Sequence, residues 1–190
     1  MSARQSTDLF GPRPHDPGGR SKPRWPAGSV VSARFSDCGL YRYELFEQWD
    51  VNLPLAMFLL MNPSVACTEF ADPTLIRTST FARSWNYGGQ LVGNVHAYRV
   101  TDSARLVEAA DPVGPENDGS LAAMAKRADI VVLAYGRPPK PLRARANQVV
   151  SMLCNEGVRL TYLRLSKDGT PQHPLYLPGS LVPREWRAAA

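Results

Sequence analysis

The sequence has few cysteines and histidines, which excludes several kinds of site. Its three cysteines are odd in number, scattered, and never arranged as a Cys-x-x-Cys pair. This argues against a disulfide framework and against a cysteine zinc site. Of the three histidines, His15 lies near the N-terminus, so only His96 and His173 remain as candidate ligands. We therefore predict that the protein holds no metal ion.

Long apolar runs and phosphate-binding loops are also missing. No apolar run approaches the roughly 20 residues that cross a bilayer, and the N-terminus lacks the apolar stretch of a signal peptide. We predict a cytoplasmic protein that does not associate with membranes. Neither a GxxxxGK[ST] nor a GxGxxG motif follows an expected strand, so neither a nucleoside-triphosphatase loop nor a dinucleotide site is indicated. We predict no cofactor.

Basic residues are concentrated near the N-terminus. The net charge is +5, and residues 1–30 hold five basic and two acidic side chains. Residues 1–28 are crowded with Pro, Gly, Arg and Ser and show no apolar periodicity. We predict a disordered basic tail over residues 1–28 and a single α/β domain over residues 29–187. Such a tail can add salt-sensitive affinity for phosphate or be a solvated leader, and both interpretations stay open.

Strand and helix signals alternate along the rest of the chain. Residues 30–35 and 41–46 alternate in polarity around a turn, which predicts an antiparallel hairpin at the domain edge. Apolar runs predict strands at 55–61, 91–95, 130–134 and 158–165, and helical spacing predicts helices between them. This order is typical of right-handed βαβ units with helices on both sides of a sheet. We predict an α/β fold with three α/β/α layers, a four-stranded, mainly parallel sheet and an N-terminal β-hairpin.

Three polar side chains follow the ends of predicted strands. Asn62 follows the first core strand, Asn94 ends the second, and His173 follows the last. The carboxyl ends of parallel strands share one edge, so we expect these side chains to meet over one crevice. A carboxamide has one acceptor and two donor hydrogens, which suits reading the edge of a base. A structural role for Asn94, tying strand to loop, and for His173 stays open.

Further candidates flank these residues. Pro63 fixes φ and bends the chain after the first core strand. Phe70 can stack on a planar ligand or pack in the core. Arg99 and Lys167 follow strands and can hold a phosphate or remain solvated surface charges. Asp72 precedes a proline, so it is read as a helix N-cap, with a catalytic carboxylate as the alternative.

Several short stretches carry a resemblance to a known family. They are Tyr41-Arg42-Tyr43, Met61-Asn62-Pro63-Ser64, Asp72-Pro73-Thr74, and residues 94–99, 111–118 and 173–177. Over residues 34–182 the chain resembles a bacterial and phage family called domain of unknown function 1643. That family name implies no activity.

The order of elements also resembles that of the uracil-DNA glycosylase superfamily. That superfamily has a four-stranded parallel sheet, a Gly-x-(Asp/Asn)-Pro motif after its first strand and a His-Pro-Ser-Pro-like loop after its last. The resemblance implies that Asn62 positions the attacking water and that Asn94 reads the extruded base. It also implies that His173 stabilises the departing base anion and that an aromatic residue near Phe70 stacks on the base.

The chain departs from this superfamily at four positions. Leu60 and Ser64 stand where glycine is expected, and Leu175 and Tyr176 replace a serine and a proline of the last motif. Glycine permits a close backbone approach that these residues narrow. The departures indicate a different substrate or a pocket that does not cleave one. We predict Asn62 and His173 as catalytic residues, and as substrate-binding residues Pro63, Ser64, Phe70, Asn94, Arg99 and Lys167.

Three functions follow from these candidates. The first is a glycosylase-like hydrolase that cleaves an N-glycosidic bond in DNA or in a nucleotide. The second is a non-catalytic protein on the same fold that binds a nucleotide or nucleic acid. The third is a different small-molecule enzyme with Asp72 or Glu69 as its base. In the first two, nucleic acid or a nucleotide is the predicted partner.

Overall fold

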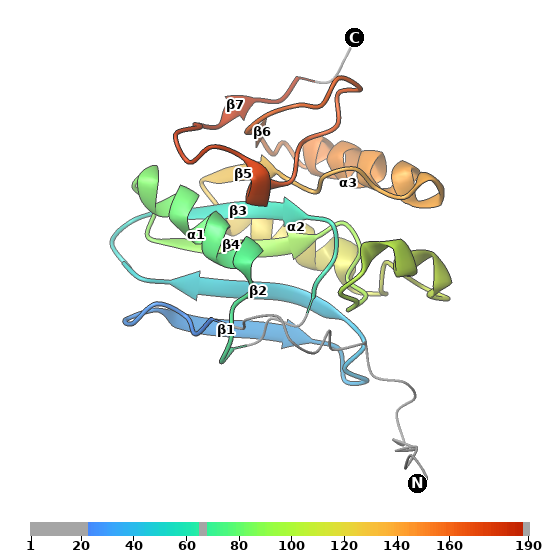
Figure 1. The fold of residues 1–190 in the computed structure, drawn as a ribbon, viewed down its shortest axis with the longest axis horizontal. Coiled ribbons are helices and arrows are strands. Elements are labelled where there is room, and N and C mark those ends of the chain that lie inside the picture. Colours follow the sequence, from blue (N-terminus) through green and yellow to red (C-terminus); the bar gives the residue numbers. More distant parts are fainter. Residues whose placement is uncertain (1–22, 65–67, 188–190) are drawn as a thin grey trace, which may run out of the picture.

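The strands of the chain join into one mixed sheet (Figure 1). The computed structural model describes residues 23–64 and 68–187. In spatial order the sheet of this part of the chain contains β1 (Val30–Phe35), β2 (Arg42–Gln48), β4 (Gly89–Asn94), β3 (Leu55–Leu60), β5 (Ile130–Leu133), β6 (Leu160–Tyr162) and β7 (Arg184–Glu185). The central strands β4, β3, β5 and β6 are parallel, and the outer strands are antiparallel to their neighbours.

The prediction of a four-stranded sheet is wrong in size, because the described sheet has seven strands. The predicted hairpin is confirmed as β1 and β2, but β2 also pairs with β4, so the hairpin extends the sheet. At the opposite edge β7 pairs with β6. The sequence does not predict β7, because two residues are too few to form a periodic pattern.

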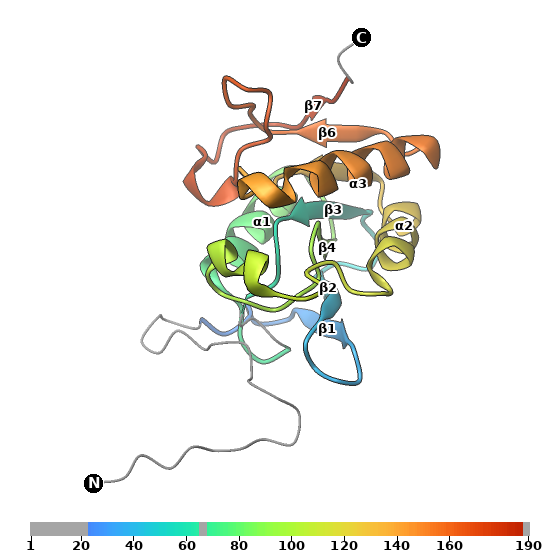
Figure 2. The ribbon, with the colours of Figure 1, turned by 90° about the vertical axis from the view of Figure 1, so that its right-hand side faces the viewer.

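Helices cover both faces of the sheet, as predicted (Figure 2). Successive side chains of β3 point to opposite faces, which explains its continuous apolar run. Met57 and Leu59 pack in the core formed with α2 (Asn117–Arg127) and α3 (Arg143–Asn155). Ala56 and Phe58 pack against α1 (Pro73–Ser84) on the other face. The sheet is therefore the middle of three layers.

Helix α1 begins with the cap that the sequence predicts. The Asp72 carboxylate accepts a hydrogen bond from the Leu75 backbone N–H at 2.9 Å, and Pro73 occupies the first helical position. This satisfies one of the N–H groups that a helix start leaves without a partner. The cap fixes Asp72 at the N-terminus of α1.

A β-bulge interrupts the hairpin at Tyr43. Arg34 pairs with Glu44 and Phe35 pairs with Arg42, so Tyr43 is an extra residue between them. Glu44 forms an ion pair with a residue of α2 and therefore faces that helix. Without the bulge, Arg42 would face the same way, because residues two apart share a face in a strand. The bulge instead turns Arg42 toward the layer of α1.

Part of the stretch predicted as a disordered tail contacts the domain. Residues 1–22 lie outside the described residues, but residues 23–28 contact the domain. Arg24 forms an isolated β-bridge with Phe70, and the Pro23 carbonyl accepts the Ala71 N–H at 2.9 Å. Trp25 packs against the apolar cluster beneath them. Residues 23–25, within the stretch predicted as a tail, therefore pack against the domain.

Within the described residues, no helix has both the length and the apolar character that a membrane span requires.

Candidate functional site

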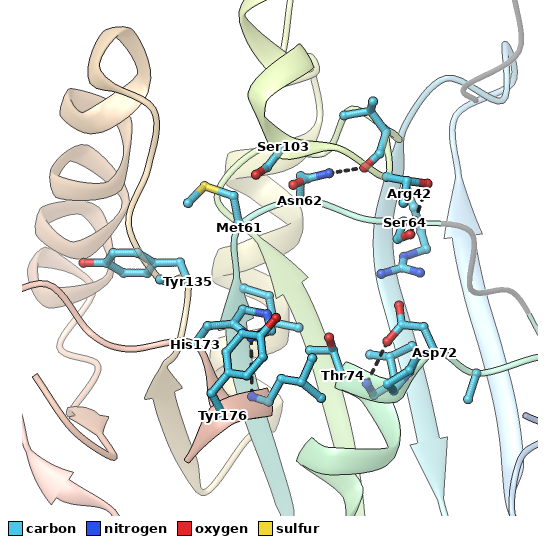
Figure 3. Close-up of a pocket in the computed structure, with 18 of the residues that line it drawn as sticks. Arg42, Met61, Asn62, Ser64, Asp72, Thr74, Ser103, Tyr135, His173 and Tyr176 are labelled. Atoms are coloured by element: carbon cyan, nitrogen blue, oxygen red, sulfur yellow. Dashed lines mark hydrogen bonds between the residues drawn. The ribbon is translucent and has the colours of Figure 1, made fainter. Parts of the chain in front are cut away.

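A cavity of about 400 Å³ opens at the edge where the central parallel strands end. The loops after β3, β5 and β6 form its walls, together with the start of α1 and the start of β2. Its size lies in the range of small-molecule sites, and the ends of parallel strands are where α/β proteins bind ligands. This cavity is the candidate site (Figure 3).

Three of the predicted site residues line this cavity together. Asn62 and Ser64 come from the loop after β3, and His173 comes from the loop after β6. Asn62 and His173 lie 111 residues apart in sequence, and the parallel topology brings them to one edge of the sheet. Asn62 and His173 therefore line one cavity, as expected from their positions after strand ends.

Asn94 does not line the cavity. It is the last residue of β4, 1% exposed, and paired in register with Leu60 of β3. Within the described residues, neither its Nδ2 nor its Oδ1 has a hydrogen-bond partner. Asn62 lies two residues beyond the end of its strand, whereas Asn94 is still inside β4. Its side chain therefore stays at the level of the sheet.

Phe70 and Pro63 also lie outside the lining. Phe70 is held by its bridge to Arg24, next to the residues that precede α1. Pro63 is buried, and its carbonyl accepts the Val100 N–H at 3.0 Å, which ties the loop after β3 to the segment after β4. Pro63 thus shapes the loop that carries Asn62 and does not face the cavity.

The two predicted phosphate-binding residues are elsewhere too. The Arg99 Nη1 donates to the Gly39 carbonyl at 2.9 Å, and the guanidinium lies over the Phe35 ring. Arg99 therefore braces the hairpin turn. Lys167 is exposed in the loop between β6 and His173 and does not reach the cavity.

The Asn62 carboxamide is held in one orientation. Its Nδ2 donates to the carbonyls of Pro63 and Val100. Because both partners are acceptors, the nitrogen is identified and the Oδ1 is the remaining polar atom. Within the described residues, no hydrogen bond to that Oδ1 is found. Asn62 can therefore offer the cavity an acceptor, which is suited to orienting a water molecule or a hydroxyl group.

The His173 imidazole is also held in one tautomer. Its Nδ1 accepts the Leu175 N–H at 3.4 Å, so in the neutral ring the proton lies on Nε2. Burial lowers the pKa of His173, and the nearby Asp72 carboxylate partly opposes this effect. The ring is therefore neutral at pH 7, and its Nε2–H is a donor available to a ligand.

Arg42 and Arg137, which the sequence prediction leaves out, also line the cavity, as does Asp72, the alternative catalytic carboxylate. Arg42 is 2% exposed, and Figure 3 draws its guanidinium between Ser64 and Asp72. Asp72 lines the cavity from the start of α1 in addition to capping it. Arg137, after β5, lies at the rim and pairs with Asp168 at 2.5 Å. The cavity is thus polar and carries both signs of charge.

An exposed tyrosine stands at the mouth of the cavity. Tyr176 is 85% exposed, and its ring centroid lies 6.2 Å from that of His173, tilted by 48°. A large aromatic side chain this exposed buries little of its area within the chain itself. An isolated aromatic residue in a loop has no periodicity, which is why the sequence prediction does not find it.

Within the described residues, no group of three or more His, Cys, Asp or Glu side chains is placed to hold a metal ion.

Comparison with known families gives one match. The family described as "Protein of unknown function (DUF1643)" matches residues 42–175, which include Arg42, Asn62, Asp72 and His173. No curated protein and no solved structure matches the chain.

Proposed function

The chain belongs to the DUF1643 family of proteins of unknown function, and we propose that it is a glycosylase-like hydrolase. The proposed reaction cleaves the N-glycosidic bond between a base and the sugar of a nucleotide or nucleic acid. One observation carries the proposal. The Asn62 Oδ1 acceptor and the His173 Nε2–H donor are each fixed by hydrogen bonds of their other atoms and line the same cavity.

The nucleophile in this reaction is water. Its oxygen forms a bond to the sugar carbon as the carbon–nitrogen bond breaks, and the electron pair of that bond leaves with the base. The Asn62 Oδ1 accepts a hydrogen bond from the water and orients it, since a carboxamide cannot take a proton usefully. Asp72 is the one carboxylate among the described lining residues, and it accepts the proton that the water loses.

The leaving base carries the developing negative charge. A neutral His173 donates its Nε2–H to an oxygen of the base and stabilises that charge. Tyr176 at the mouth takes the stacking role expected of an aromatic residue near Phe70, because every base presents a π-face. The resemblance of the loops around Asn62 and His173 to those of the uracil-DNA glycosylase superfamily supports the same roles.

Base release from a substrate panel tests the proposal. The panel contains oligonucleotides with uracil, hypoxanthine and damaged bases, together with free nucleotides, and chromatography detects the free base. We expect Asn62→Ala and His173→Gln each to lower release by about a hundredfold, as for removal of one preorganised donor or acceptor. Asn52→Ala, in an exposed turn, is the matched control and should release base at the normal rate. Absence of base release from every substrate would reject the hydrolase.

One observation favours a second function, non-catalytic binding of a nucleotide. Asn94, the residue expected to read the base edge, does not reach the cavity. A pocket without that contact can hold a base by stacking on Tyr176 without positioning it for cleavage. Saturable nucleotide binding with no turnover, measured by titration calorimetry, would identify this function. Deletion of residues 1–22 would then show how much of the affinity depends on the basic N-terminal segment.

A further inference from the structure

We propose that the Arg42 end of the cavity is a binding site for a phosphate group attached to the substrate sugar. This inference rests on the proposed function for the base and sugar, and it names the substrate class as a nucleoside phosphate. The shared ligand chemistry is a phosphate ester, which a free nucleotide or a polynucleotide can supply.

The position of Arg42 depends on the bulge at Tyr43. Arg42 is 2% exposed and lines the cavity from the start of β2. The bulge turns this side chain away from α2 and toward the cavity, at a cost in regular strand pairing. Bulges that re-aim a side chain in this way are common beside active sites.

Hydroxyl groups complete this end of the cavity. Ser64 and Thr101 line it, with their side-chain oxygens 3.4 Å apart, and Thr74 contributes a third hydroxyl from the first turn of α1. Phosphate oxygens accept hydrogen bonds from hydroxyls, and a guanidinium matches their geometry with two parallel donors. These side chains are therefore chemically suited to a phosphate ester.

The order of the strands places this end away from the base. Arg42 lies on β2, Asn62 follows β3 and His173 follows β6, with one strand between each pair. Neighbouring strands lie about 4.8 Å apart, so each step spans about 10 Å at sheet level. Figure 3 draws them in the same order, with His173 and Tyr176 on one side, Arg42 on the other and Asn62 above the space between. Base, sugar and phosphate can lie along this line.

Asp72 shares this end of the cavity and must be reconciled with a bound anion. One of its oxygens accepts the Leu75 N–H, and the positive end of the α1 dipole further offsets its charge. The charged lining residues are Arg42, Arg137 and Asp72, with His173 neutral, so the described lining carries a net positive charge. The cavity therefore still favours an anionic ligand.

The test compares nucleosides with their 5′-monophosphates as probes. Titration calorimetry measures the dissociation constants of four ribonucleosides, four deoxyribonucleosides and the corresponding monophosphates for the full chain. We expect each nucleotide that binds to bind at least about tenfold more tightly than its nucleoside, as for hydrogen bonds to a charged group. Arg42→Gln should abolish this preference and leave nucleoside affinity unchanged.

Two further variants keep the test decisive. Arg127→Gln, on α2, removes the same charge from the opposite face and should retain the wild-type preference. Arg42→Lys keeps the charge but lacks the paired donors, so it serves if Arg42→Gln does not fold, and it should reduce the preference severalfold. A wild-type protein without the preference, or a folded Arg42 variant that retains it, would overturn the proposal.

Additional measurements distinguish a free nucleotide from a polynucleotide as the source of the phosphate. They also test the phosphate site separately from the hydrolase. A dinucleotide without a terminal phosphate tests a bridging phosphodiester, and its Arg42-dependent binding would identify a polynucleotide as the source. Binding of monophosphates alone would identify the free nucleotide. Base release without a phosphate preference would reject this site and retain the hydrolase. An Arg42-dependent preference without base release would reject the hydrolase and retain the site.

Discussion

Two polar clusters lie on the α1 side of the sheet, and they differ in how their hydrogen bonds are used. The first, which we call the Glu47 cluster, is formed by Ser29, Glu47, Ser79, Arg83 and Gln90. The second, the cavity cluster, is formed by Arg42, Asn62, Ser64, Asp72 and His173. Both clusters include a residue of β2 and a residue of α1 or its N-cap; the Glu47 cluster adds Gln90 of β4 and Ser29 before β1, and the cavity cluster adds the loops after β3 and β6.

In the Glu47 cluster both carboxylate oxygens of Glu47 are paired inside the protein. Glu47 is 0% exposed, one carboxylate oxygen accepts from Ser29 at 2.8 Å, and the other accepts from Ser79 and from Gln90. Arg83 lies 3.7 Å from the first oxygen. In the cavity cluster, by contrast, Asn62 and His173 each use one polar atom internally and leave another facing open space. A carboxylate whose two oxygens are both paired inside the protein indicates a structural role, and oriented but unused atoms that line a cavity indicate a site for a ligand.

The largest expected effect comes from removing the carboxylate of the Glu47 cluster. We expect Glu47→Ala to lower the free energy of unfolding by about 3–5 kcal/mol, because it leaves buried donors and a nearby guanidinium without their acceptor. Glu116→Ala, which removes an exposed ion pair with Arg34, is the matched control and should cost less than about 1 kcal/mol. Urea unfolding measures both. A loss for Glu47→Ala no larger than the control would contradict the structural role.

The same logic predicts the opposite pattern for Asp72. We expect Asp72→Asn to lower turnover by about a hundredfold with little change in the free energy of unfolding, since asparagine caps a helix as well as aspartate but cannot accept the proton. Asp102→Asn is the matched control. It changes another cap that accepts a backbone N–H at 2.9 Å outside the cavity, and it should leave turnover unchanged. Normal turnover in Asp72→Asn would show that Asp72 acts only as the helix N-cap.

A third buried polar group, His96, belongs to neither cluster. It is 0% exposed, and burial, together with the Arg145 guanidinium, lowers its pKa from 6.5 to about 4. Between these values the unfolded chain binds the proton and the folded chain does not, so stability falls as pH falls below 6.5. We expect a loss of about 2 kcal/mol between pH 6.5 and 5, at about 1.4 kcal/mol per pH unit.

Urea unfolding at a series of pH values measures this dependence. His96→Leu should flatten the slope, because it removes the proton-binding group without changing the carboxylates. His173→Gln retains His96 and should keep most of the slope. The pKa of His173 is lowered in the same direction, but its ring borders the cavity and contributes the smaller part. A slope unchanged in His96→Leu would show that other groups control the acid sensitivity.

The sequence predicts the core strands well and the edges of the sheet less well, for physical reasons. A strand buried on both faces must be apolar throughout, so β3 stands out as a continuous run. The first part of β4 is missed because Gly89 and Gln90 lack side chains typical of strands. Gly89 is required there, since a Cβ would lie 2.6 Å from the Glu47 carbonyl, and Gln90 is buried in the Glu47 cluster.

The site is predictable only where position along the strand decides it. Asn62 and His173 are found because both follow strand ends, whereas Asn94 is misplaced by lying just inside its strand. Arg42 cannot be found from periodicity, because an arginine beside alternating tyrosines is typical of a solvent-facing position. Its orientation depends on the bulge and on the pairing of β2 with β4, which are long-range features. Tyr176 has no pattern at all.

The smallest changes in nucleotide affinity are expected at the rim of the cavity. Their sign and salt dependence distinguish the rim charges from the buried Arg42. The Arg137 guanidinium holds the pKa of Asp168 well below its usual range, and the two side chains form an ion pair in which only Arg137 lines the cavity. Asp168→Asn should strengthen nucleotide binding a few-fold at low salt, and Arg137→Gln should weaken it by a similar factor. Both effects should fade at high salt, because exposed charges are screened, while the effect of Arg42→Gln should persist. Rim variants that shift affinity in the same direction, or independently of salt, would show that Arg137 acts through loop structure and not through its charge.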